Sequence, residues 1–127
     1  MKKLIYLFAM LCVSLSIFAY TPPAPEKMSY QAVIRNSSNA LVANHLVGMR
    51  ISILQFTSTG TAVYVETQTP TTNVNGLVTI QIGSGTPTLG VFSNIEWSVG
   101  PYFIKTETDP AGGTAYTITA TSELISV

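Results

Sequence analysis

The side chains that could carry acid–base chemistry are few and far apart in the sequence. His45 is the only histidine and Asp109 the only aspartate among the 127 residues. Ser-His-Asp catalysis would have to combine these two residues, and their positions give no reason for them to meet. His45 follows Asn44 in a turn-like stretch, where a lone histidine is most often a surface residue. We therefore expect no catalytic residues and no enzymatic activity.

Glu107 and Asp109 are the carboxylates whose spacing could suit a metal ion. They lie two apart, so both could face one way at the end of a strand. Calcium takes about six to eight oxygen ligands, and the sequence does not reveal the others. The favoured interpretation is a solvated strand end, with no metal and no cofactor. The glycines of Gly83-Ser84-Gly85 and Gly112-Gly113 precede strand or proline-containing loop rather than a helix, so they predict turns and not a phosphate site.

The first 19 residues predict a signal peptide. Lys2 and Lys3 precede Leu4–Ala19, which is apolar and uncharged. This segment is shorter than the roughly 20 residues that span a bilayer comfortably, although a short membrane anchor remains the alternative. Cys12 lies inside it without the small preceding residue that a lipoprotein requires. Cleavage after Ala19 would leave a chain without cysteine, which excludes disulfides, thiolate metal sites and a thiol nucleophile.

The remaining chain suits one domain outside the cytoplasm. Residues 20–27 form a Pro-rich lead-in, and residues 28–127 are long enough to bury a core. Loss of Lys2 and Lys3 leaves four basic and six acidic residues, a net charge of −2 with His45 neutral. A weakly acidic chain with few cations argues against a nucleic-acid partner and against binding to a membrane surface after cleavage.

Apolar and polar residues alternate along most of this domain. Short alternating segments separated by turn signals, including Asn75-Gly76, predict a Greek-key antiparallel β-sandwich of about seven strands, of immunoglobulin or prealbumin-like type. The alternation lapses between Gly83 and Gly100, which we expect to be a long connection with at most a helical turn over Val91–Trp97. A sixth strand is expected at Tyr116–Thr121 and the start of another at Leu124. The expected core comprises Tyr30, Ala32, Ile51, Ile53, Val63, Val65, Val78, Ile80, Ile82, Ile104, Tyr116 and Ile118.

Three aromatic residues gather at the end of the long connection. Trp97, Tyr102 and Phe103 flank Gly100-Pro101. Large rings most often plug the open end of a sandwich, so Trp97 is expected to be buried against the strand that begins at Tyr102. In the alternative, the three rings are exposed together and bind a glycan.

Four segments together carry a resemblance to a known family. They are Met28-Ser-Tyr-Gln-Ala-Val-Ile-Arg35, Asn73-Val-Asn-Gly-Leu-Val-Thr-Ile80, Phe92-Ser-Asn-Ile-Glu-Trp97 and Gly100-Pro-Tyr-Phe-Ile-Lys105. The chain resembles the N-terminal module of large secreted or surface proteins of Gram-negative bacteria, which precedes collagen-like or tail-fibre-like regions. The resemblance implies no catalytic residues. A looser likeness, at the level of the fold, is to carboxypeptidase-regulatory and collagen-adhesin B-type sandwiches.

Composition and resemblance together predict an exported, non-catalytic structural or presentation module at the surface of a Gram-negative bacterium. Its expected partners are downstream domains of the same polypeptide or other cell-surface proteins, with a glycan as the alternative ligand. Because similar modules continue past a Ser-Val like Ser126-Val127, we expect the domain to be truncated at its C-terminal end.

Overall fold

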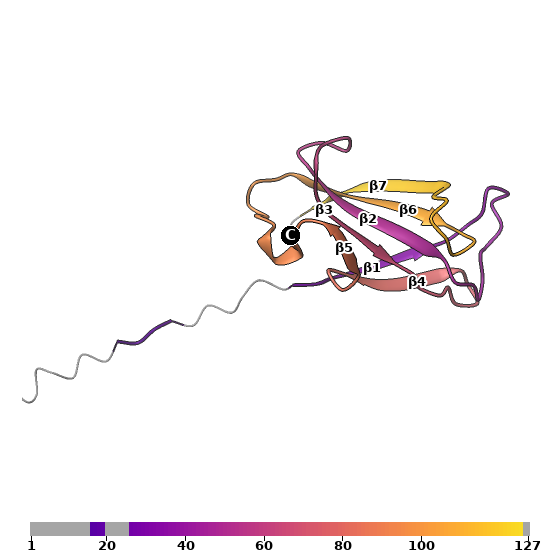
Figure 1. The fold of residues 1–127 in the computed structure, drawn as a ribbon, viewed down its shortest axis with the longest axis horizontal. Coiled ribbons are helices and arrows are strands. Elements are labelled where there is room, and N and C mark those ends of the chain that lie inside the picture. The colour runs from indigo at the N-terminus through magenta and orange to yellow at the C-terminus, as the bar shows by residue number, and fades with distance from the viewer. Residues whose placement is uncertain (1–15, 20–25, 126–127) are drawn as a thin grey trace, which may run out of the picture.

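The computed structural model describes residues 16–19 and 26–125, so most of the expected signal peptide and Ser126-Val127 lie outside the described residues. The regular secondary structure of the described part consists of strands and one short 3-10 turn (Figure 1). Within it, no helix is both long and apolar enough to cross a membrane. The elements are β1 (Met28–Val33), β2 (Gly48–Gln55), β3 (Ala62–Gln68), β4 (Leu77–Ile82), β5 (Thr86–Leu89), the 3-10 turn η1 (Phe92–Asn94), β6 (Tyr102–Asp109) and β7 (Ile118–Leu124).

The strands form two antiparallel sheets packed as a sandwich, as the sequence predicts. One sheet pairs β1 with β4, and the other has the order β5-β3-β2-β6-β7. Figure 1 shows the two-stranded sheet below the larger one. The chain crosses between the layers after β1, β3 and β4, and β6 then returns beside β2. These crossings bring segments far apart in the sequence into one core.

The core is centred on β2, which is paired on both sides. Its residues Met49, Ile51 and Ile53 are almost completely buried and face the smaller sheet. Val78, Ile80 and Ile82 of β4 meet them from the opposite layer. Each set occupies alternate positions, because successive side chains of a strand point to opposite faces. The expected core residues of β2 and β4 are confirmed.

The prediction that Val63 and Val65 form the inward face of β3 is wrong for Val65. Tyr64 and Glu66 are the buried residues of this strand, at 1% and 0% exposed. Val65 pairs with Ser52 and lines the outer face of the larger sheet. Val63 lies next to the register shift opposite Ile53 and packs partly against the core. The alternation Val-Tyr-Val-Glu offers two acceptable faces, and Val65, which belongs to the more apolar one, points outward.

Two expected strand assignments also need correction. β5 lies inside the segment expected to be a connection, at the edge of the larger sheet, where Pro87 can be accommodated. The expected sixth and seventh strands are a single strand, β7. The total is still seven because β5 is an additional strand that the sequence does not predict. Tyr116 precedes β7, and its ring packs on Arg50 outside the core. The expected helical turn is η1.

Candidate functional site

Four aromatic rings form a continuous chain at the end of the sandwich where β1 begins. Tyr64 packs edge-to-face on Phe92, Phe92 on Trp97, and Trp97 on Tyr102, with ring centroids 5.3, 5.7 and 5.2 Å apart. Phe92 is the buried residue of η1, so the rings attach the β5–β6 connection to the core. Edge-to-face pairs stabilise such a cluster beyond the area they bury.

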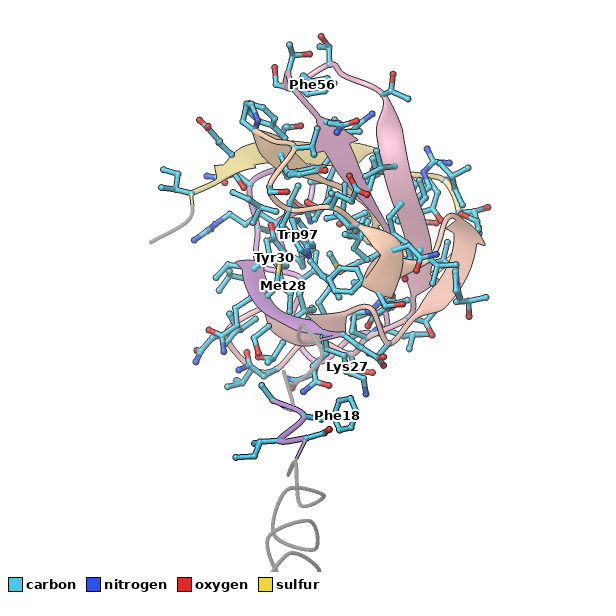
Figure 2. All side chains as sticks on the ribbon, turned by 90° about the vertical axis from the view of Figure 1, so that its left-hand side faces the viewer. Phe18, Lys27, Met28, Tyr30, Phe56 and Trp97 are labelled. Carbon is cyan, nitrogen blue, oxygen red and sulfur yellow. The ribbon has the colours of Figure 1, made fainter. Side chains whose placement is uncertain are left out.

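Trp97 is less buried than the sequence analysis expects. It is 37% exposed, whereas the neighbouring Tyr102 is 4% exposed. The Tyr102 hydroxyl donates a 2.6 Å hydrogen bond to the Glu96 carbonyl oxygen and accepts one from the Gln55 side chain. Trp97 thus covers Tyr102 on one side and faces the surface on the other. Figure 2 shows it near Met28 and Tyr30, between the two layers.

The three rings of the glycan hypothesis do not share one surface. Tyr102 points into the core, and the following residue, Phe103, points to the outer face of the larger sheet. Phe103 pairs with Leu54 of β2 and is half-buried there. Of the three rings, Trp97 combines a large ring with an exposed part at this end. A platform of three converging rings is therefore absent from this arrangement.

Replacing Trp97 by alanine should lower the free energy of unfolding by about 2–3 kcal/mol, because only part of the ring is buried and full burial costs about 3–5 kcal/mol. Chemical denaturation of the wild type and the variant measures this loss. Val99→Ala, an exposed position in the same connection, is the control and should change the midpoint little. An unchanged midpoint together with lost retention on a polysaccharide column would instead support glycan binding by Trp97.

Glu66 is a buried acid whose role no local sequence pattern indicates. It is 0% exposed, and its carboxyl oxygens accept hydrogen bonds from the backbone N–H groups of Gly83, at 2.5 Å, and Gly85. The Gln68 side chain donates a third bond at 3.2 Å. Gly83 has φ +102° and a Cβ at Gly85 would collide with the Glu66 carboxyl, so both glycines are needed at this turn. Glu66 therefore holds the β4–β5 turn against β3.

Glu107 belongs to an ion-pair network on the outer face of the larger sheet. Arg50 donates two hydrogen bonds to its carboxylate, at 2.7 and 2.9 Å, and Lys105 lies 3.5 Å away. The bidentate bond from Arg50 lowers the pKa of Glu107, and the same bond raises the pKa of Arg50. The guanidinium also lies 4.6 Å from the centre of the Tyr116 ring. These contacts tie β2 to β6 and to the segment before β7.

Asp109 organises the turn between β6 and β7. Its carboxylate accepts hydrogen bonds from the N–H groups of Ala111 and Ala115, at 2.9 and 3.1 Å. These bonds, that from Ala111 first, lower the pKa of Asp109. Glu107 and Asp109 thus have separate partners, and among the described residues no three His, Cys, Asp or Glu side chains are close enough to hold a metal ion.

His45 lies closer to the Asp109 turn than the sequence indicates. It borders a shallow hollow that Pro110 and Ala111 also line. Its Nδ1 atom lies 2.6 Å from the Leu46 carbonyl oxygen, a contact that requires a proton on Nδ1. The Asp109 carboxylate is occupied by the turn amides. The imidazole and carboxylate therefore each bind the backbone instead of each other.

Asp109→Asn should destabilise the protein at neutral pH and much less in acid. A lowered folded-state pKa means that the stabilisation is present above the unfolded carboxyl pKa and is lost as the pH falls towards the folded value. Unfolding curves of the wild type and the variant from neutral pH into strong acid should therefore converge. A difference that stays constant over that range would show that the charge of Asp109 does not matter.

The chain matches one family model, described as a domain of unknown function (DUF8740), over residues 29–122. The chain belongs to the DUF8740 family. The matched residues extend from the start of β1 into β7, so the DUF8740 domain is the sandwich itself. No curated protein and no solved structure matches the chain.

Proposed function

We propose that the chain is a non-catalytic structural or presentation module of an exported bacterial surface protein, which spaces or supports downstream domains. The main observation in its favour is the use of its acidic side chains. Glu66 and Asp109 hold turns through backbone N–H groups, and Glu107 is bound by Arg50. Acids used in this way fix the loops of a rigid module and are saturated by their partners.

The exported location is supported by the sequence. Lys2 and Lys3, followed by the apolar Leu4–Ala19, have the layout of a signal peptide. The sandwich begins after the Pro-rich residues 20–27, which would separate it from the site of cleavage. A domain without cysteine after cleavage is stabilised by its core rather than by disulfides, which fits the continuous cluster formed by the two layers.

Expression of the whole chain in a Gram-negative host should yield exported protein that begins near Tyr20. Intact-mass measurement of the exported fraction checks this result, because loss of residues 1–19 changes the mass by a defined amount. A Lys2→Glu, Lys3→Glu variant is the control and should accumulate unprocessed inside the cell. Exported material that retains Met1 would contradict the proposed signal peptide.

Glycan binding is the second candidate function, and the exposed part of Trp97 favours it. Because Tyr102 is buried and Phe103 lies on another face, such binding would depend on Trp97 alone among the three rings. Retention on polysaccharide columns, compared between the wild type and Trp97→Ala, tests this role separately from stability.

A further inference from the structure

One side of the sandwich is open between β1 and β7. β4 lies across from β3, since Gly83 at its end is bonded to Glu66. β1 lies towards the other edge, because Met28 lines the same hollow as Leu124 and Ile125 at the end of β7. The larger sheet has five strands and the smaller one two, so on the β7 side the larger sheet extends beyond the smaller one.

The inward face of β7 is correspondingly exposed. Ala120 pairs with Thr106 of β6, and Ser122 pairs with Ile104. Directly paired residues share a face of a sheet. Thr106 and Ile104 are 5% and 4% exposed, yet Ala120 and Ser122 are exposed. Their small side chains leave room above this part of the sheet for larger side chains.

The open side ends in an apolar hollow of about 370 Å³. Met28, Trp97, Pro101, Leu124 and Ile125 line most of it. The exposed part of Trp97 faces this region, and Figure 2 shows Trp97 and Met28 close together between the layers. Met28 and Leu124 also pack against the core cluster, so the hollow continues the established interface between the two sheets.

Among residues 16–19 and 26–125, no strand pairs with the outer edge of β1, which lies beside this space. The Ile34 N–H donates to the Gly76 carbonyl oxygen at 2.8 Å, which fixes the direction of the ladder between β1 and β4. By the alternation of antiparallel pairing, the N–H and C=O groups of Ser29, Gln31 and Val33 point away from β4. An unpaired edge beside an uncovered part of the core is a template for one more strand.

A folded second copy does not fit this space through its own β1. That strand would lie over β7 and bring the larger sheet of its own copy beneath it, about 10 Å away, into the position that β7 already occupies. A bare strand has no second layer and avoids this collision. A single extended segment therefore suits the open side better than a folded second copy does.

We propose that the open side between β1 and β7 binds an extended segment of another protein, which adds a strand to β1. Alternate residues of this segment are apolar and cover Ala120, Ser122 and Trp97, while its backbone pairs with β1. This inference goes beyond the proposed spacer function and does not depend on it.

A short synthetic peptide of alternating valine and threonine, with a lysine at each end, is a suitable probe. The sequence contains one tryptophan, so the fluorescence of Trp97 reports directly on the hollow. We expect a saturable blue shift, and protection of the Ser29, Gln31 and Val33 amides from hydrogen exchange. The same peptide with a central proline loses a backbone donor and should bind at least about tenfold more weakly.

Two variants of β7 locate the binding site. Ala120→Lys places a charge on the inward face and should abolish the shift, whereas Thr119→Lys lies on the opposite face and should leave it unchanged. The proposal is overturned by an absent shift up to the solubility limit, by equal binding of the proline peptide, or by protection at the β5 edge instead. Concentration-dependent self-association that protects the β1 amides without peptide would also overturn it, in favour of a second copy.

Discussion

Glu66→Ala is expected to lower the free energy of unfolding by about 2–5 kcal/mol. The substitution leaves the N–H groups of Gly83 and Gly85 without their acceptor and opens a space in a fully buried position. Each buried donor left unsatisfied costs about 1–3 kcal/mol. Chemical denaturation followed by circular dichroism measures the loss, which is a large part of the stability of a small domain.

Glu66→Gln is the matched control for this experiment. Glutamine has nearly the same volume and keeps one acceptor oxygen, but its amide nitrogen cannot accept a hydrogen bond from the second N–H group. We expect a loss of about 1–2 kcal/mol, clearly smaller than that of the alanine variant. A loss below about 0.5 kcal/mol for Glu66→Ala would mean that the carboxyl group does not hold the β4–β5 turn.

Ile80→Ala should cost about 2–5 kcal/mol, the range for truncation of a large aliphatic side chain in a packed core. Ile80 is 4% exposed and packs between the two sheets. The neighbouring Thr79 points to the exposed face of β4, so Thr79→Ala should change stability by no more than about 0.5 kcal/mol. Equal losses for the two variants would contradict the assignment of the β4 faces.

Local signals in the sequence predict the parts of the fold that depend on neighbouring residues. In β2, Met49, Ile51 and Ile53 alternate with polar residues, and all three are buried. At Asn75-Gly76, the Gly76 backbone has φ +73° and its N–H donates to the Asn73 carbonyl oxygen, as expected for a tight turn. Strand alternation and turn chemistry therefore suffice for a sandwich with most of its core.

Contacts between distant segments decide the features that the sequence does not reveal. Glu66 is buried because a turn 17 residues later donates N–H groups to it. The residues next to Glu66 in the sequence do not indicate this contact. β5 contains Pro87, which is compatible with a strand only because β5 lies at a sheet edge. Trp97 stays partly exposed because the layer that would cover it ends at β1. Each outcome depends on strand order, which alternation does not specify.

Hydrogen exchange at the carboxyl-bound turns tests most directly whether the acids of this domain have a structural role. The amides of Gly83, Gly85, Ala111 and Ala115 lie outside the strands but donate to Glu66 or Asp109. If these acids fix a rigid module, the four amides should exchange about as slowly as those of β2, through opening of the whole domain. Fast exchange at these amides, at rates typical of exposed loops, would contradict the structural role and the spacer function built on it.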